Sequence, residues 1–324
     1  MKLVIISICF NEGKTVGELL DRMPKKIKGI DQITRVIVDD GSHDDTIEIA
    51  KKHGAVVLEN KQNKRLTHSF QKAVDYALEN GADIMVNIDG DLQFDPEQIP
   101  KLVEPVVSGE SDFVVGDRFT DEKTGEVRRP KNMPITKYWG NILGTMVVGW
   151  ISKKKFHDVT SGFRAYNREA LLNININTTD TYTQESFQIL TEKKLNIKQI
   201  PVKVTYFAKR KSRVVTNVIT YICKSTVNIL KAFRDFAPLK FFSIFALIPF
   251  VPGVICSLFV VMYWLNHGTF TPYKFIGFTG IYLISLAIIV FVVGIMADMM
   301  DRIVHNQEKI LYFSKKTYYT RNKK

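Results

Sequence analysis

The first half of the chain alternates short apolar runs with segments whose apolar residues recur at helical spacing. The runs predict strands and the periodic segments predict helices, in the order strand 3–8, helix 15–23, strand 35–39, helix 44–53, strand 55–59, helix 67–79, strand 83–88, helix 96–107 and strand 112–115. Strands that alternate with helices in this way are typical of a parallel sheet covered on both faces. In such sheets ligands bind beyond the carboxyl ends of the strands. We therefore expect an α/β domain with its site at that edge.

The pattern becomes less regular after the fifth strand. A polar, basic stretch at residues 120–134 precedes a predicted helix at residues 135–151. The segment 158–166 then precedes a predicted helix at residues 184–194 and a strand at residues 197–207. We assign these elements to the same domain.

Two apolar runs follow, Phe241–Trp264 and Phe275–Ala297, and neither contains Asp, Glu, Lys, Arg or His. Each exceeds the roughly 20 residues that a helix needs to cross the hydrocarbon core of a bilayer. Pro249 and Pro252 can kink the first run but do not exclude a membrane span. The runs predict two transmembrane helices, and the competing interpretation is a pair of buried core helices.

Positive charge is concentrated beside these runs. The net charge of +12 is made up by residues 205–240, with +7, and residues 301–324, with +5. A nucleic-acid-binding protein would carry its basic residues on a face of the folded domain, so we expect no nucleic-acid partner. Residues 265–274, between the runs, contain Lys274 as their one charged residue. By the positive-inside rule this predicts a multi-pass protein of the cell membrane, with the α/β domain and both termini cytoplasmic.

Between the domain and the first run, residues 214–235 carry apolar side chains at helical spacing, with lysine and arginine off the apolar stripe. A basic amphipathic helix beside a membrane span lies in the headgroup layer. A surface helix packed on the domain has the same pattern and stays open as an alternative. The chain is thus predicted to begin with a cytoplasmic domain at residues 1–213, followed by a juxtamembrane amphipathic helix at residues 214–240. Two transmembrane helices, at about 241–264 and 275–297, are predicted within residues 241–297, and a basic cytoplasmic tail at residues 298–324.

Two acidic clusters follow predicted strands. In the first, Asp39-Asp40-Gly41-Ser42, a carboxylate at a strand end can accept hydrogen bonds from a nucleobase or a ribose. A turn followed by a helix cap is an equally good interpretation of that cluster alone. In the second, Asp89-Gly90-Asp91-Leu92-Gln93, the oxygen ligands suit Mg²⁺ or Mn²⁺ bridged to phosphates. A solvated loop is the alternative for this second cluster.

Further motifs follow these clusters in a fixed order. The full series is Phe10-Asn11-Glu12, Val38-Asp39-Asp40-Gly41-Ser42, Asp89-Gly90-Asp91-Leu92-Gln93-Phe94-Asp95-Pro96, Gly116-Asp117-Arg118 and Asp158-Val159-Thr160-Ser161-Gly162-Phe163-Arg164. With this series the chain resembles the family-2 glycosyltransferases of the GT-A fold, in the branch that acts on polyprenol phosphates. The resemblance implies a Rossmann-like, mostly parallel sheet and a C-terminal hairpin of two transmembrane helices.

The resemblance also implies an activity. The chain would transfer a hexose or N-acetylhexosamine from a nucleotide-sugar to undecaprenyl or dolichyl phosphate, at the cytoplasmic membrane face and with inversion. UDP-hexose or UDP-N-acetylhexosamine is expected as the donor ahead of GDP-mannose, and Mg²⁺ or Mn²⁺ as the cofactor. Membrane lipids are further partners, and a homo-oligomer stays open. A glycosyltransferase with a hydroxyl lipid acceptor and a non-catalytic membrane scaffold are the alternatives.

Residue roles follow from the same resemblance. The donor side consists of a nucleoside group, a metal group and the sugar-site segment Ser161–Arg164, with Glu12, Asp39 and Asp40 at the nucleoside and Asp89, Asp91 and Gln93 at the metal. The acceptor side is expected to consist of Arg118, Lys137, Arg210 and Arg213. The last two are expected as phosphate or headgroup contacts, and a purely positive-inside role is the alternative for them.

Three points depart from the family pattern or leave a role open. Asp158 is the acid expected nearest the reacting centre, and whether it acts as a base or orients a substrate stays open. Lys137 stands where relatives often have arginine, which exchanges a bidentate fork for a point charge. Asp117 replaces the small residue that is usual between the glycine and the arginine of its motif. A lipid phosphate is largely anionic at pH 7, so the expected acceptor needs no deprotonation.

Overall fold

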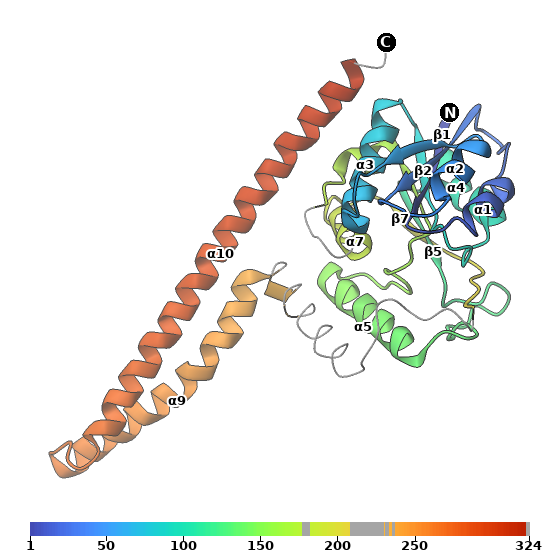
Figure 1. Cartoon of the computed structure of the whole chain (residues 1–324). Helices are drawn as coiled ribbons and strands as arrows, with labels where there is room; N and C mark the ends of the chain where they lie inside the picture. The colour runs from blue at the N-terminus through green and yellow to red at the C-terminus, as the bar shows by residue number, and fades with distance from the viewer. Residues whose placement is uncertain (177–181, 208–229, 231–232, 235–236, 322–324) are drawn as a thin grey trace. The chain divides into compact units, whose positions relative to one another are not determined.

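The chain forms two compact units in the computed structural model (Figure 1). The structure describes residues 1–324 except 177–181, 208–229, 231–232, 235–236 and 322–324. The α/β unit contains residues 1–218 and 310–324, and the helical unit contains residues 219–309. Most of the predicted amphipathic helix at residues 214–235 lies outside the described residues. Arg210 and Arg213 also lie outside them.

A seven-stranded sheet forms the centre of the α/β unit, in the order β3-β2-β1-β4-β6-β5-β7. Its strands are β1 (Lys2–Cys9), β2 (Gln32–Asp39), β3 (Val56–Glu59), β4 (Ile84–Asn87), β5 (Phe113–Asp117), β6 (Arg164–Asn167) and β7 (Ile197–Pro201). All neighbouring strands pair in parallel except β6, which is antiparallel to both β4 and β5. The sheet is therefore mostly parallel, as the resemblance implied.

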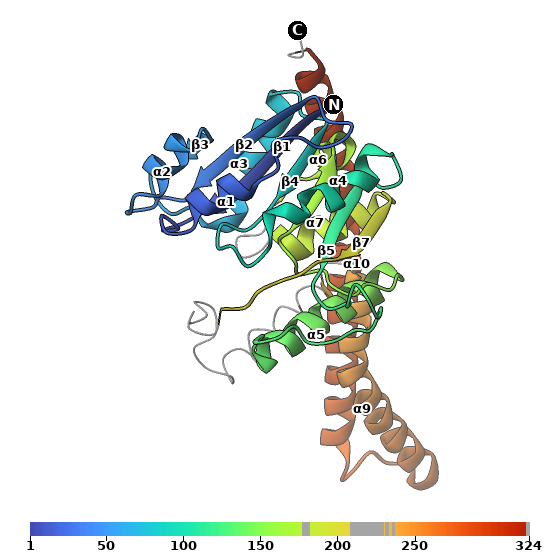
Figure 2. The ribbon, with the colours of Figure 1, turned by 90° about the vertical axis from the view of Figure 1, so that its right-hand side faces the viewer.

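Helices cover both faces of this sheet because successive side chains of each strand point to opposite faces. In β1, Leu3 and Ile5 face one core and Val4 and Ile6 the other. The first core is closed by α1 (Val16–Arg22), α2 (Thr46–Lys52) and α4 (Ile99–Val107), the last preceded by the 3-10 turn η1 (Pro96–Gln98). The second is closed by α3 (Arg65–Glu79), α6 (Arg168–Asn173) and α7 (Tyr182–Glu192). Figure 2 shows α5 (Ile135–Ser152) beyond the ends of β5 and β7, and Val148 of α5 reaches the second core beside α7.

The sequence did not predict β6 or α6. β6 has four residues, and its first, Arg164, is fully buried, so no apolar run or alternation marks it as a strand. The predicted strand 197–207 is also too long, since β7 ends at Pro201. Beyond it the chain makes one isolated bridge, between Phe94 and Val204. The remaining predicted strands and helices of this unit are confirmed to within three residues at each end.

Two long helices carry the apolar runs of the C-terminal part, α9 (Pro238–His267) and α10 (Lys274–Arg321). Both are long and apolar enough to cross a membrane, and only 17% of the most apolar window of each is buried. That low burial is unlike a core helix of a soluble protein. The helices pack closely at Gly280, where a Cβ atom would lie 2.5 Å from Ser257 Oγ and 3.0 Å from the Gly253 carbonyl oxygen. Small residues of this kind let membrane helices approach each other.

Helix α10 continues past the predicted second span through most of the predicted tail. Its last turns, from Ile310, belong to the α/β unit. There Tyr312 donates a hydrogen bond to Glu169, the Lys315 ammonium donates to the Ile174 carbonyl, and Tyr319 lies in the core beside α3 and α6. The part of the basic tail from Ile310 to Arg321 thus belongs to the α/β unit.

Candidate active site

The loops that follow β1 and β2 are tied together at the carboxyl edge of the sheet. The Asn11 amide N–H donates to Ser42 Oγ at 2.9 Å, and the Glu12 amide N–H donates to Thr46 Oγ1 at 2.9 Å. Thr15 Oγ1 donates to the carbonyl oxygen of Gly90 at 2.8 Å, which joins the β1 loop to the loop that carries Asp89 and Asp91. The predicted nucleoside and metal residues therefore lie on loops that support one another.

Asp39 ends β2 and is completely buried. Its Oδ2 accepts hydrogen bonds from the backbone N–H groups of Gly41 at 3.0 Å and Ser42 at 2.9 Å. Its Oδ1 is buried and has no hydrogen-bond partner within the described part of the chain. Buried acceptors are almost always paired in native proteins, so this oxygen is suited to accept a hydrogen bond from a ligand N–H or O–H.

Asp40, expected beside the nucleoside, is committed to the protein itself. Its Oδ1 accepts hydrogen bonds from Asn60 Nδ2, from the Lys64 amide and from Ser69 Oγ, at 2.9–3.0 Å. This carboxylate holds residues 60–64 against α3. Through its Oδ1, Asp40 thus supports the loop beside Asp39, and its place near the nucleoside stays a prediction.

Asp89 and Asp91 follow β4 as a pair of nearby carboxylates. The pKa of Asp89 is raised to about 6, first by burial and then by the charge of Asp91, while Arg118 and Lys137 oppose the rise. Asp89 packs against Gly162, where a Cβ atom would lie only 2.6 Å from Asp89 Oδ1. Glycine is therefore required there for the carboxylate to occupy its place.

These two carboxylates fit a divalent cation. Crowded acidic groups repel each other, and a cation would relieve that repulsion. The described residues contain no group of three or more His, Cys, Asp or Glu side chains that could hold a metal by themselves. Mg²⁺ typically takes one or two carboxylates and completes its shell with phosphate oxygens and water. The pair is thus suited to a cation that arrives with a diphosphate.

Gln93, expected as a third metal ligand, makes two hydrogen bonds to Asp91. Its side-chain Nε2 donates to Asp91 Oδ2 at 2.7 Å, and its backbone N–H donates to Asp91 Oδ1 at 3.1 Å. The amide nitrogen is a donor, so a cation would be bound by the side-chain oxygen of Gln93. In this arrangement Gln93 orients the Asp91 carboxylate.

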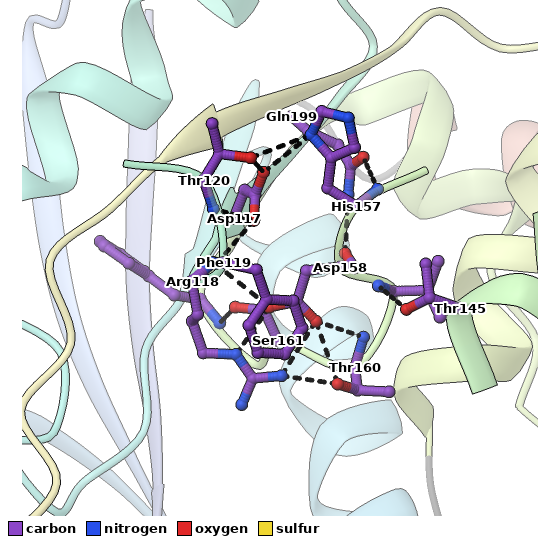
Figure 3. A network of polar contacts seen from close by, with 12 residues as sticks. Asp117, Arg118, Phe119, Thr120, Thr145, His157, Asp158, Thr160, Ser161 and Gln199 are labelled. Atoms are coloured by element: carbon purple, nitrogen blue, oxygen red, sulfur yellow. Dashed lines mark hydrogen bonds and ion pairs between the residues drawn. The ribbon is translucent and has the colours of Figure 1, made fainter. Parts of the chain in front are cut away.

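Arg118 and Asp158 form a two-bond ion pair (Figure 3). Arg118 Nε lies 2.6 Å from Asp158 Oδ2, and Arg118 Nη2 lies 2.9 Å from Asp158 Oδ1. The side chain of Arg118 is 7% exposed and that of Asp158 is fully buried. Burial alone would raise the pKa of Asp158, but the charge and hydrogen bonds of Arg118 outweigh it and lower this pKa. Asp158 is therefore a paired carboxylate and a weak base.

The same ion pair leaves part of the guanidinium for a ligand. Arg118 Nη2 also donates to Thr160 Oγ1 at 2.5 Å, and Nη1 donates to the Tyr206 hydroxyl at 3.3 Å. Four of the five side-chain N–H groups then have acceptors, and the fifth, on Nη1, has none within the described residues. Arg118 can offer a single hydrogen bond to an anion without losing its contacts.

Lys137, on α5, completes a group of charges drawn from distant segments. Its ammonium lies 5.0 Å from the centre of the Tyr206 ring. Burial lowers the pKa of Lys137, as does the charge of Arg118, while Asp91, Asp89 and Asp158 oppose the change. Asp89, Asp91, Arg118, Lys137 and Asp158 therefore lie within electrostatic reach of one another.

Arg164 and Ser161 do not line an open site. Arg164 is completely buried and donates hydrogen bonds to the carbonyl oxygens of Ser161 at 2.6 Å and Val159 at 2.8 Å, and to Ser186 Oγ at 2.8 Å. Ser161 is also completely buried, and its Oγ accepts a hydrogen bond from the Phe163 amide. This corrects the expectation that both side chains meet the sugar: they support the segment that carries Asp158.

Tyr206 and Thr160 contact Arg118 and were not singled out from the sequence. Thr160 stood inside a quoted motif, where its threonine could have been read as a partner for the arginine. Tyr206 lies beyond the end of β7 and packs with Phe119 and Met133. No local pattern distinguishes this tyrosine from the apolar residues around it.

A mostly parallel α/β sheet with acidic clusters at its carboxyl edge is an arrangement in which nucleotides commonly bind. Residues 4–174 match the family model described as "Glycosyl transferase family 2". The chain belongs to glycosyltransferase family 2 and is a glycosyltransferase. The expected family and the GT-A fold are thereby confirmed.

Named relatives are consistent with this assignment. The chain is 34% identical to the uncharacterized protein MJ1222 of Methanocaldococcus jannaschii, over 68% of this chain and 87% of that protein. It is 29% identical to the UDP-N-acetylglucosamine–dolichyl-phosphate N-acetylglucosaminyltransferase of Methanococcus voltae, over 63% of this chain and 86% of that protein. A solved structure of glucosyl-3-phosphoglycerate synthase from Mycobacterium tuberculosis, with Mn²⁺, UDP and glucosyl-3-phosphoglycerate, shares the fold. The TM-score is 0.53 at 18% identity, over 72% of this chain and 78% of that one.

Proposed function

We propose that the chain transfers a sugar from a nucleotide-sugar to the phosphate of undecaprenyl or dolichyl phosphate, at the cytoplasmic face of a membrane. The observation that carries the proposal is the Arg118–Asp158 ion pair, which commits the expected acid to a cation. A hydroxyl acceptor requires a base to remove its proton. A phosphate monoester is already largely anionic at neutral pH, so it can attack without one.

The surrounding charges suit two anionic substrates that repel each other. Arg118 offers its remaining N–H group and Lys137 its ammonium to the acceptor phosphate. The buried Oδ1 of Asp39 is suited to accept a hydrogen bond from the nucleoside. Mg²⁺ or Mn²⁺ held by Asp89 and Asp91 would offset the charge of the leaving nucleoside diphosphate.

The proposed reaction is a single displacement at the anomeric carbon. An oxygen of the lipid phosphate forms a bond to C1 of the sugar, and the bond from C1 to the diphosphate oxygen breaks. The electron pair of that bond leaves with the nucleoside diphosphate, and the configuration at C1 is inverted. Residues of this chain hold the two reacting anions in line, which can supply much of the rate enhancement.

The exposed face of α5 supports delivery of the acceptor from a membrane. Its large apolar side chains fall within an arc of about 80° at 100° per residue, and they are 44–64% exposed: Ile135, Trp139, Leu143, Met146 and Trp150. Exposed lysines flank the helix at Lys131 and at residues 153–155. Tryptophan beside lysine is typical of the interface between lipid and water. The opposite face of α5 contacts the site, where Thr145 Oγ1 accepts from the Val159 amide.

This placement solves a delivery problem. Each CH₂ group of a polyprenyl chain withdrawn into water costs about 0.8 kcal/mol, so the lipid head has to be met at the membrane. The basic segments that flank α9 and α10 support a cytoplasmic position for the α/β unit.

Among donors, we place UDP-hexose and UDP-N-acetylhexosamine ahead of GDP-mannose. The relative named for UDP-N-acetylglucosamine is matched over 86% of its length. A relative named dolichol-phosphate mannosyltransferase, from Pyrococcus furiosus, is matched over 49% of its length. The sugar is therefore an explicit variable of the test.

The test is transfer by the purified full chain in detergent. A panel of labelled nucleotide-sugars is incubated with undecaprenyl or dolichyl phosphate, and acid-labile glycolipid is extracted and counted. We expect labelled glycolipid only with a polyprenyl phosphate, loss of labelling on metal chelation, and loss in Arg118→Ala and Asp91→Ala.

The matched substrate control is the polyprenol without phosphate, which keeps the chain and removes the charge. The matched protein control is Glu110→Gln, a surface carboxylate that pairs with Lys198. Transfer to the free polyprenol, diacylglycerol or ceramide in place of the phosphate lipid would overturn the proposed acceptor. Glycolipid formation that persists in Asp91→Ala under chelation would overturn the metal dependence.

A further inference from the structure

Two adjacent residues at the end of β5 pair with two adjacent residues of the segment 157–160 (Figure 3). Arg118 pairs with Asp158, and Asp117 Oδ2 lies 3.1 Å from His157 Nδ1. The order of acid and base is inverted between the two pairs. A shift by one residue would place the Asp117 and Asp158 carboxylates against each other, and like charges directly opposite are destabilising. This alternation favours a single register of the segment against β5.

The side chain of Gln199, on β7, makes two hydrogen bonds to the backbone of the same segment. Its Oε1 accepts a hydrogen bond from the His157 amide at 2.7 Å, and its Nε2 donates to the Asp158 carbonyl oxygen at 2.7 Å. One side-chain amide thus satisfies the two peptide groups on either side of the pair His157–Asp158. Segments outside helices and strands depend on such hydrogen bonds to hold one backbone conformation. Gln199 therefore fixes the backbone at Asp158.

Asp117 holds the other end of the pair. It is 1% exposed, and its Oδ1 accepts hydrogen bonds from the Phe119 amide at 2.8 Å and the Thr120 amide at 3.2 Å. Its Oδ2 accepts from Thr120 Oγ1 as well as facing His157. A carboxylate only accepts, so His157 Nδ1 carries the proton in this contact. The unusual acid of the Gly116-Asp117-Arg118 motif is therefore matched by a histidine of this same chain.

We propose that Asp117, His157 and Gln199 are positioning residues that set the orientation of Arg118 toward the acceptor phosphate. The inference rests on the proposed function for the identity of that anion. In Figure 3, His157 and Gln199 lie on one side of the segment 157–160 and the Arg118 guanidinium on the other. They act on the acceptor through Asp158 and Arg118.

The experiment compares His157→Ala and Gln199→Ala with wild type in the purified full chain. The acceptor is a short polyprenyl phosphate in detergent, and kcat and KM are measured for acceptor and donor separately. We expect kcat/KM for the acceptor to fall about tenfold or more, because a displaced catalytic group loses this much rate. The KM for the nucleotide-sugar should stay within about twofold, since Asp39 and Asp89 are held by other loops. His157→Asn, which keeps an N–H donor at the Nδ1 position, should restore activity.

Gln98→Ala is the matched control. The side chain of Gln98 also makes two hydrogen bonds to the backbone, accepting from the Lys203 amide at 2.8 Å and donating to the Lys203 carbonyl oxygen at 3.0 Å. Lys203 lies outside the segment 157–160. Thermal unfolding of both glutamine variants checks that they lose similar stability. A merely structural role would make the two variants alike, or would raise both KM values together, and either result would overturn the proposal.

A second measurement does not depend on activity. The Nε–H signal of Arg118, identified by its loss in Arg118→Lys, is followed by ¹⁵N NMR of arginine-labelled protein. We expect slow solvent exchange in wild type and Gln98→Ala and faster exchange in Gln199→Ala and His157→Ala. Unchanged exchange would overturn the positioning role. Faster exchange in a protein that transfers nothing to polyprenyl phosphate would leave that role intact and overturn the proposed function alone.

Discussion

The guanidinium of Arg164 donates a hydrogen bond of 2.8 Å to the carbonyl oxygen of Val159, the residue that follows Asp158. Arg164 is surrounded by the rings of Phe113, Tyr182 and Phe187 at 5.5–5.9 Å from their centres. A buried cation held by carbonyl oxygens and aromatic rings supports the active-site segment from inside the domain. It does so without touching a substrate.

Replacement of Arg164 by methionine should therefore lower stability and transfer together. The change leaves the Val159 and Ser161 carbonyl oxygens and Ser186 Oγ without their donor, at about 1–3 kcal/mol for each unsatisfied group. Arg164→Lys should recover part of the loss, because an ammonium can satisfy some of these acceptors. Thermal unfolding and transfer assays measure both effects. An Arg164→Met protein with wild-type stability would contradict this supporting role.

Asp39 gives a prediction for nucleotide binding. Because Asp39 Oδ1 is buried and unpartnered in the described part of the chain, it should gain a hydrogen bond from the nucleoside. Hydrogen bonds to charged groups contribute about 1.5–3 kcal/mol, so Asp39→Ala should weaken binding roughly tenfold or more. Calorimetric titration with the nucleoside diphosphate measures the change. The control is Asp75→Ala on α3, which should bind normally; equal affinity in both variants would remove Asp39 from the nucleoside site.

The ion pair of Arg118 and Asp158 predicts a pH dependence of stability. Because the pKa of Asp158 is lowered in the folded protein, the charged carboxylate stabilises the fold. That contribution is complete above the unfolded value of about 3.9 and is lost as the pH falls through the lower folded pKa. Breaking a buried ion pair costs about 3–5 kcal/mol. The unfolding temperature of Asp158→Asn should therefore lie well below that of wild type at pH 7.

The difference between wild type and Asp158→Asn should shrink below about pH 4, where the carboxyl group of the unfolded wild-type chain becomes protonated, and should be lost as the pH falls through the lower folded pKa. Thermal unfolding in detergent from pH 7 to pH 3 follows it. Glu97→Gln, which removes an exposed partner of Arg22, should differ little from wild type throughout. A gap that widens toward acid would show that the buried group is stabilised in its neutral form.

Much of the α/β unit could be predicted because its elements carry local signals. β1, β2 and β4 are short apolar runs, and their carboxyl ends carry the two acidic clusters. β6 could not be predicted, because its first residue is the buried Arg164 and its antiparallel pairing depends on the neighbouring strands β4 and β5. A local sequence pattern shows neither the partners of a buried arginine nor the pairing of strands that are distant in the chain.

The candidate site shows the same limit. The acidic clusters after two strands indicated Asp39, Asp89 and Asp91, and the resemblance to the family indicated Arg118. The sequence could not separate the side chains that face a ligand from those that hold the loops, because that depends on partners far along the chain. Asp40 meets Asn60 and Ser69, and Arg164 meets Ser186.

The helical unit yields a prediction on close packing. A Cβ atom at Gly280 would lie 2.5 Å from Ser257 Oγ and 3.0 Å from the carbonyl oxygen of Gly253, so Gly280→Leu should force α9 and α10 apart. A cysteine pair introduced at Val260 and Gly277, which face each other, should then cross-link more slowly than in the parent. Ile281→Leu, one residue on and 62% exposed, is the control. Equal cross-linking in all three proteins would contradict the close approach.

The last turns of α10 provide a matched pair of neighbouring tyrosines. Tyr319 is 8% exposed and lies in the core of the α/β unit, whereas Tyr318 is 55% exposed. Large-to-small changes in a core cost about 3–5 kcal/mol for an aromatic residue, and surface changes stay within about 0.5 kcal/mol. Tyr319→Ala should therefore lower the unfolding temperature of the α/β unit, while Tyr318→Ala leaves it unchanged. Thermal unfolding in detergent, followed through the loss of bound nucleotide, measures both. If the two variants unfold alike, the end of α10 contributes nothing to that core, and the tail would be a tether without a structural role.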